Sequence, residues 1–289
     1  MKFRPFNIDS NDNSLFVTEQ CNNNCLMCSQ PPRKVDDIEK LFDENLLRIK
    51  DAPKDLPIIG ITGGEPTLLG DKLFVLIQSI REKLPNTKIH MLTNGRRFSD
   101  AEFAKELVCV GGDSLVLGVP LHSDYERDHD IIAGSKGAYQ ETMLGLYNIG
   151  AVGICIELRI VMNLLNYKRF LPMAKFIHKN LPFVGWTAFM GMEFVGAAIK
   201  HSSKVWIEPK DYIENLTDAV DYLSGWNYYV DIYNIPLCLL PPKYHVFARR
   251  SISDWKNKFA EDCNICSAKN ECCGLFSTSK RIYQGLKAI

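Results

Sequence analysis

The stretch TEQCNNNCLMCSQPP, residues 18–32, places Cys21, Cys25 and Cys28 within eight positions and then stops. A closed structural zinc or iron–sulfur site takes four protein ligands. Three thiolates on a four-iron, four-sulfide cluster leave one iron open, and a substrate or cosubstrate can bind there. The alternatives are a zinc site with a fourth ligand from elsewhere, or three plain thiols.

The segment that leads into this cysteine loop is the first of six short apolar stretches rich in β-branched residues. Stretches with the apolar spacing of helices separate them. Repeated strand–helix units predict a parallel α/β sheet with right-handed crossovers, either an open doubly wound sheet or a partial (βα)6 TIM-like barrel. The expected strands are 14–18, 57–62, 88–93, 114–120, 153–162 and 183–190.

The overall composition narrows the classes of function. Lys plus Arg and Asp plus Glu both number 34, so no basic field favours nucleic acid. The N-terminus lacks an export signal, and no apolar run approaches the roughly 18 residues that span a bilayer. We therefore expect a cytoplasmic protein with no membrane segment. Ten cysteines in that reducing compartment indicate metal or redox use rather than disulfides.

The spacing Cys-x3-Cys-x2-Cys is the signature of the radical S-adenosylmethionine (SAM) superfamily, which this sequence resembles. The resemblance implies a [4Fe–4S] cluster on Cys21, Cys25 and Cys28, with SAM chelating the open iron. One electron would then cleave SAM, and the resulting 5′-deoxyadenosyl radical would abstract a hydrogen atom from the substrate. Met27 stands where family members usually carry an aromatic residue, and we expect it to contact the cofactor.

A second cluster, GGEP at 63–66, follows the second expected strand directly, where parallel α/β folds gather reactive groups. Gly63 and Gly64 would let the backbone approach a ligand closely, and Glu65 is an acceptor in the same turn. The alternative is a glycine-rich turn into a helix that begins at Pro66. The cluster resembles the superfamily motif that binds the methionyl amine of SAM, which implies that role for Glu65 and the flanking backbone.

Two further strands carry candidate SAM contacts. Thr93 and Asn94 end the third strand and would hydrogen-bond the ribose, although Asn-Gly is also a common turn. On the fifth strand, Glu157 and Arg159 share the face that points inward, and charges there need a partner or a ligand. Either they pair with each other, or Arg159 binds the carboxylate of SAM as a bidentate fork.

Two other features are weaker. The long polar loop expected after the fourth strand, residues 121–139, contains His129 and Asp130 as candidates for the substrate region. Cys109, in the helical pattern FAKELVCV, is interpreted as a small buried hydrophobe.

The pattern changes beyond residue 205, where a helix and then a strand or hairpin precede a cysteine-rich tail. We place a boundary near residue 200, with a barrel at 1–200 and a small subdomain at 201–289. The tail is similar to the twitch half of SPASM domains, which implies an auxiliary [4Fe–4S] cluster, whereas a zinc knuckle is the alternative. The expected ligands are Cys238, Cys263, Cys266 and Cys272, with Cys273 as a spare or substitute.

The wording of four stretches resembles one subgroup, the His-Xaa-Ser system radical SAM maturases of the HxsC type. They are TEQCNNNCLMCSQPP, ITGGEPTLL, NIPLCLLPP and RRSISDWKNKF. Membership implies modification of a ribosomally made precursor peptide alongside a companion radical SAM protein, with a donor such as flavodoxin or ferredoxin. Because the first cysteine comes at residue 21, no room is left for a leader-binding domain, and we expect a partner protein to recognise the precursor.

Two other classes of function remain open on the sequence. The same barrel could act on a nucleotide or another small molecule. Alternatively, the chain could be a non-catalytic iron–sulfur or zinc protein that binds a partner.

Overall fold

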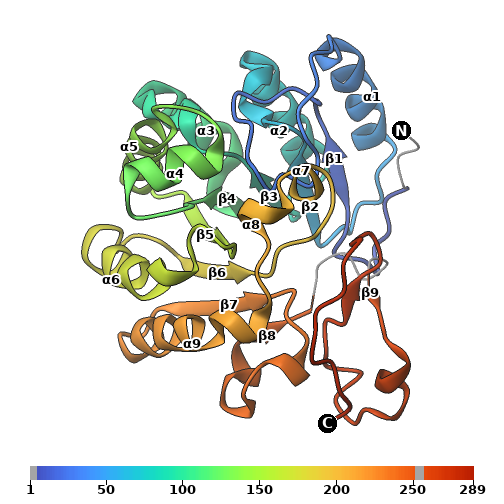
Figure 1. Cartoon of the computed structure of the whole chain (residues 1–289). Coiled ribbons are helices and arrows are strands. Elements are labelled where there is room, and N and C mark those ends of the chain that lie inside the picture. The colour runs from blue at the N-terminus through green and yellow to red at the C-terminus, as the bar shows by residue number, and fades with distance from the viewer. Residues whose placement is uncertain (1–4, 251–256) are drawn as a thin grey trace. The chain divides into compact units, whose positions relative to one another are not determined.

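The computed structural model describes residues 5–250 and 257–289 (Figure 1). The middle of the RRSISDWKNKF stretch, at 251–256, lies outside the described residues. The chain divides into two compact units that are interleaved in sequence. The first comprises Met1–Asn24, Gln30–Val119 and Gly137–Glu157, and the second comprises Cys25–Ser29, Pro120–Lys136 and Leu158–Ile289. The boundary near residue 200 stays a prediction.

Within the described residues, eight strands form a sheet whose hydrogen-bonded neighbours follow the order of the chain. The strands are β1 (Ser14–Phe16), β2 (Ile58–Thr62), β3 (Lys88–Leu92), β4 (Leu115–Pro120), β5 (Cys155–Val161), β6 (Trp186–Met190), β7 (Tyr229–Tyr233) and β8 (Ala248–Arg249). The pairs β1–β2, β2–β3, β3–β4, β6–β7 and β7–β8 are parallel. The six predicted strands are confirmed, and this is the strand–helix repeat of a partial TIM-like barrel, extended by β7 and β8.

In the first unit, helices follow the strands and bury one apolar stripe each. They are α1 (Ile38–Lys50), α2 (Asp71–Lys83), α3 (Ala101–Gly111) and α5 (Ala138–Ala151). Helix α2 shows the rule, because Leu73, Ile77 and Ile80 recur at helical spacing and are fully buried. Along this unit α1 packs on α2, α2 on α3, and α3 on α5 (Figure 1).

One prediction about this unit is wrong. Cys109 is exposed rather than buried. The buried stripe of α3 consists of Phe103, Ala104, Leu107 and Gly111. Two positions beyond Leu107, a side chain points to the opposite side of a helix, so the Cys109 thiol faces outward.

In the second unit, the longer helices pack on each other beside β6 and β7. The helices are α4 (Glu126–Ala133), α6 (Phe170–Asn180), α7 (Ala197–Lys200), α8 (Ser202–Val205) and α9 (Pro209–Gly225). Helix α9 begins at Pro209, whose fixed φ suits a first turn, and it buries Leu216, Val220 and Leu223 against α6 and β7. A short antiparallel pair, β9 (Asn257–Lys258) and β10 (Leu275–Phe276), lies in the tail.

The expectation of a long loop at 121–139 is wrong for its middle. Residues 126–133 form α4, which ends at Gly134 in a left-handed conformation. No helix among residues 5–250 and 257–289 has the length and apolar character that crossing a bilayer requires.

Candidate functional site

The entrance to the cysteine loop is held against the end of β2. Gly64 N donates to Thr18 O at 2.7 Å, and Glu65 N donates to Gln20 O at 2.8 Å. A Cβ atom on Gly64 would lie 1.9 Å from Gln20 O, so only glycine fits. Gly63 has φ +156° and a similar approach to Thr18. Because Gly63 and Gly64 have no side chain, the backbone of Thr18 and Gln20 can pack against them. The sequence alone had indicated room for a ligand instead.

Cys21 lies in the first unit and is partly exposed. Its sulfur receives the backbone N–H of Asn23 at 3.4 Å, and the amide nitrogen of Asn94 lies 4.0 Å away. Donors of this kind favour a thiolate and tune iron–sulfur centres. The thiol is thus suited to a ligand role.

Cys25 and Cys28 lie in the second unit and are also partly exposed. The Cys25 sulfur is 3.9 Å from Nε2 of His122, a buried ring. The backbone at Cys28 is fixed by Ala197 N, which donates to Cys28 O at 2.9 Å. Gly196 makes this approach feasible, since a Cβ there would lie 2.6 Å from the same oxygen.

Met27, between these two cysteines, is buried in an apolar cluster of the second unit. The other buried members are Ile132, Met192, Phe194, Ala198, Val205 and Trp206. Met27 therefore anchors the cysteine loop in this apolar cluster. A contact between Met27 and a cofactor stays a prediction.

Glu65 is fully buried and joins the ends of β2 and β3. Its Oε1 accepts hydrogen bonds from Thr67 N at 3.0 Å, Thr67 Oγ1 at 2.7 Å and Thr93 Oγ1 at 2.6 Å, and its Oε2 accepts from Asn94 N at 2.6 Å. Burial raises the pKa of the Glu65 carboxyl, although these hydrogen bonds oppose the shift. Oε2 retains capacity for one further donor. The turn into a short 3₁₀ helix at Pro66 is confirmed.

The polar atoms at the end of β3 are engaged within the first unit. Thr93 Oγ1 accepts from Gly95 N at 3.1 Å in addition to its bond with Glu65. Asn94 O accepts from Thr142 Oγ1 at 3.0 Å, which ties this strand end to α5. The two residues therefore shape the strand end, and their contact with a ribose stays a prediction.

Glu157 is paired with His90 on β3 rather than with Arg159. His90 Nε2 lies 2.7 Å from Glu157 Oε2, and both side chains are largely buried. The contact between these two atoms does not have the geometry of a hydrogen bond, although it brings an imidazole against a buried carboxyl group. The sequence analysis missed His90, although a histidine between the apolar residues Ile89 and Met91 was the available signal.

Arg159, in the second unit, points its guanidinium at a thioether. Its Nε and Nη2 lie 3.1 and 3.0 Å from Met190 Sδ. A thioether is a weak acceptor for a charged fork. In the part of the chain that the structure describes, the guanidinium is therefore held by a weak acceptor.

The two histidines after β4, His122 and His129, contact each other. His122 N donates to His129 Nδ1 at 3.2 Å, and both rings are buried. Burial, followed by the neighbouring His129, lowers the pKa of His122 well below its ordinary value. Asp124 forms a bidentate pair with Arg169 at 2.7 Å for both bonds. His129 is therefore buried within α4, and a role for His129 or Asp130 in a substrate region stays a prediction.

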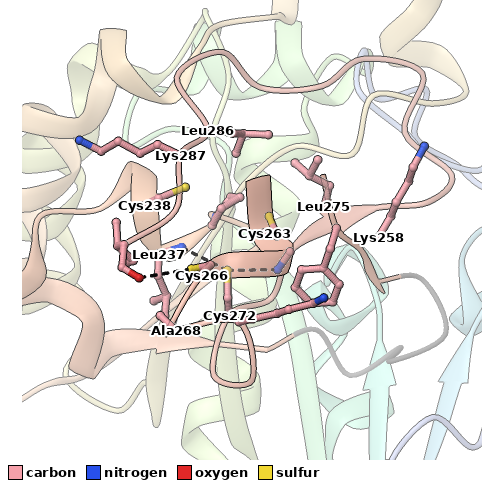
Figure 2. A pocket seen from close by; sticks show the side chains of 15 residues that line it. Leu237, Cys238, Lys258, Cys263, Cys266, Ala268, Cys272, Leu275, Leu286 and Lys287 are labelled. Atoms are coloured by element: carbon pink, nitrogen blue, oxygen red, sulfur yellow. Dashed lines mark hydrogen bonds between the residues drawn. The ribbon is translucent and has the colours of Figure 1, made fainter. Parts of the chain in front are cut away.

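The tail gathers four of its cysteines around one apolar pocket (Figure 2). Cys238, Cys263, Cys266 and Cys272 line it, while Cys273 is buried. The pKa of Cys272 is lowered to about 6, because the Cys273 thiol hydrogen-bonds its sulfur and because Gly274 N and Leu237 N donate to it at 3.3 and 3.4 Å. Cys272 thus favours the thiolate form.

In the described part of the chain, no three His, Cys, Asp or Glu side chains are placed to hold one metal ion. A four-iron cluster does not require its thiols to converge on one point, because each thiolate binds a different iron.

The structure thus defines the class of protein, which is a parallel (βα) fold with polar clusters after its strands. The family model of the radical SAM superfamily matches residues 15–177, more than half of the chain. The chain belongs to the radical SAM superfamily. Membership implies a [4Fe–4S] cluster and SAM, and the three partly exposed thiols, with an N–H donor on Cys21, fit that cluster.

Individual proteins show the same relationship. The chain is 32% identical over 154 residues to an Fe-coproporphyrin III synthase of Methanosarcina barkeri, covering 53% of this chain and 37% of that protein. Among solved structures, Streptococcus suis SuiB bound to SAM has a TM-score of 0.59 at 16% identity, covering 76% of this chain and 49% of that one. Another SuiB structure holds its precursor peptide SuiA. Escherichia coli coproporphyrinogen III oxidase has a TM-score of 0.56 at 12% identity, covering 73% and 52%.

These structural likenesses show the fold alone. The chain spans about half, or less, of the length of the proteins just compared.

Proposed function

We propose that this chain reductively cleaves SAM and uses the resulting 5′-deoxyadenosyl radical to abstract a hydrogen atom from a peptide substrate. The observation that carries the proposal is the cysteine loop itself, with three partly exposed thiols after β1 and an N–H donor on Cys21. Cys21, Cys25 and Cys28 would hold the SAM-binding cluster. When bound, this cluster supplies the electron for cleavage.

The chain's own residues would then bind and orient SAM. Oε2 of Glu65 has room for one donor and would accept from the methionyl amine, with the backbone at Gly63, Gly64 and Pro66 beside it. Thr93 and Asn94 would lie near the ribose, Met27 near the cofactor, and Glu157 inside the barrel. Arg159 would exchange its thioether partner for the methionyl carboxylate.

We also propose that Cys238, Cys263, Cys266 and Cys272 hold an auxiliary [4Fe–4S] cluster in a twitch-like subdomain at 201–289. The shared pocket and the thiolate preference of Cys272 support this assignment. The two backbone N–H donors on the Cys272 sulfur are of the kind that stabilise cluster ligands.

The substrate we propose is a ribosomally made precursor peptide of the His-Xaa-Ser type. The motif wording supports this class. The partners would be a companion radical SAM or leader-recognition protein and a reductant such as flavodoxin or ferredoxin, in the cytoplasm.

The second candidate for the substrate is a small molecule. The 32% sequence identity to an Fe-coproporphyrin III synthase favours a tetrapyrrole as that molecule.

The test is anaerobic reconstitution followed by turnover with dithionite. Wild-type protein should bind about eight irons per chain and convert SAM to 5′-deoxyadenosine. Mass spectrometry of precursor peptides, nucleosides and coproporphyrin after turnover then separates the substrates. A Cys25→Ala protein whose electron paramagnetic resonance (EPR) spectrum still responds to SAM like the wild type would refute the cluster assignment. Tightly bound zinc without turnover would instead favour a binding protein.

A further inference from the structure

Arg96 lies next to the cysteine loop, and none of the roles described above involves it. It begins a short 3₁₀ helix, Arg96–Ser99, directly after the end of β3. Only 12% of its side chain is exposed. Its Nη1 donates to Asn22 O at 2.7 Å and to Asn23 Oδ1 at 2.8 Å, while its Nε lies 2.5 Å from Glu141 Oε2 on α5. One guanidinium thus joins a strand end, a helix and the cysteine loop.

Asn94 adds a second link to one of these loop residues, Asn22. Its Nδ2 donates to Asn22 Oδ1 at 2.6 Å. The backbone N–H of Arg96 donates to Asn94 Oδ1 at 3.0 Å, which fixes the orientation of that amide. The backbone of Arg96 therefore orients Asn94, while the guanidinium of Arg96 binds the loop directly.

Asn22 and Asn23, which Arg96 binds, lie directly after Cys21, a proposed cluster ligand. Asn23 N donates to the Cys21 sulfur at 3.4 Å, so whatever fixes Asn23 also fixes this N–H···S bond. Asn22, Asn23 and Asn24 have short polar side chains, which offer hydrogen bonds rather than apolar surface. A bond from a guanidinium to a neutral oxygen is stronger than a neutral pair, and its planar fork reaches two acceptors at once.

We propose that Arg96 is a positioning residue for the SAM-binding cluster, acting through Asn22 and Asn23 to fix Cys21 and the hydrogen bond on its sulfur. The inference rests on the proposed function, because it takes Cys21 as a cluster ligand. Hydrogen bonds to the sulfurs set the reduction potential of iron–sulfur centres. Loss of Arg96 loosens this bond, and the cluster becomes harder to reduce.

Arg97 provides the matched control. It is the next residue and carries the same charge, but 53% of its side chain is exposed and its ion pair is with Asp100 at 3.4 Å. Arg96→Gln and Arg97→Gln therefore remove equal charge from adjacent positions. Arg96→Lys keeps the charge but loses the fork, and Asn23→Ala removes one acceptor from the opposite side.

The experiment is an EPR-monitored redox titration of the reconstituted proteins, with iron content and the thermal unfolding of the apoproteins measured in parallel. Arg96→Gln should show a more negative midpoint potential and cleave SAM about tenfold more slowly, which corresponds to about 1.4 kcal/mol. Arg96→Lys and Asn23→Ala should each show part of the shift, and the double variant Arg96→Gln/Asn23→Ala no more than Arg96→Gln. Arg97→Gln should match the wild type.

A wild-type potential and EPR spectrum in Arg96→Gln would overturn the inference, as would an equal shift in Arg97→Gln. If Arg96→Gln does not fold, a wild-type potential in both Arg96→Lys and Asn23→Ala overturns it equally. Failure of the proposed function has a different signature. In that case wild type and Cys21→Ala bind the same amount of iron, and neither responds to SAM.

Discussion

Replacement of Arg159 by alanine should weaken SAM binding about 10- to 150-fold. In the structure two of the three guanidinium nitrogens, Nε and Nη2, face Met190 Sδ at 3.1 and 3.0 Å, and a thioether is a weak acceptor. The methionyl carboxylate would replace this neutral partner with a charged one. Hydrogen bonds to charged groups contribute about 1.5–3 kcal/mol, and each 1.4 kcal/mol is a factor of ten in affinity.

The assay is equilibrium dialysis of labelled SAM against the anaerobically reconstituted protein. Arg159→Lys should bind with intermediate affinity, because a point charge replaces the fork. Met190→Leu is the matched control, since it nearly conserves volume while replacing the thioether with an alkyl group, so its dissociation constant should stay within about twofold of the wild type. A dissociation constant for Arg159→Ala equal to that of the wild type would show that Arg159 does not bind the carboxylate.

Three further predictions follow from close contacts and thiols. Gly64→Ala would place a methyl group 1.9 Å from Gln20 O, so urea unfolding of the apoprotein should show a loss of about 3 kcal/mol; a loss below about 0.5 kcal/mol would mean that the loop moves aside freely. Thr93→Val removes a hydroxyl donor to a buried carboxylate and should cost about 1–3 kcal/mol by the same assay, whereas unchanged stability would show that the bond contributes nothing. Cys266→Ala should lower the iron content from about eight to about four per chain while Cys109→Ala leaves it unchanged, and equal iron in both would count against the auxiliary cluster.

The six barrel strands could be read from the sequence because each is a run of apolar, β-branched residues bounded by turns. Helix α9 was equally clear, since Pro209 marks its start and its apolar residues recur at helical spacing. Helix α4 was missed because its sequence, ERDHDIIA, is polar for five of eight positions. Its buried residues are His129, Ile132 and Ala133, and composition alone assigns a histidine to the surface.

The sequence predicted which residues lie at the site, but not which residues they contact there. The position of the cysteines and of Glu65 after strands follows from the order of elements. That Glu157 pairs with His90 depends on the register of strands more than 60 residues apart in the chain. The same holds for Gly64, whose neighbour is Gln20 of a preceding segment rather than a ligand.

The two glycines that border the cysteine loop have a consequence for protein engineering. Gly64 lies against the segment that enters the loop, and Gly196 lies against the residue that closes it. Transplanting the three cysteines alone into another scaffold would meet side chains at both places. A graft that is to assemble must carry both bare backbone positions with it, although they stand about 40 and 170 residues downstream of the motif.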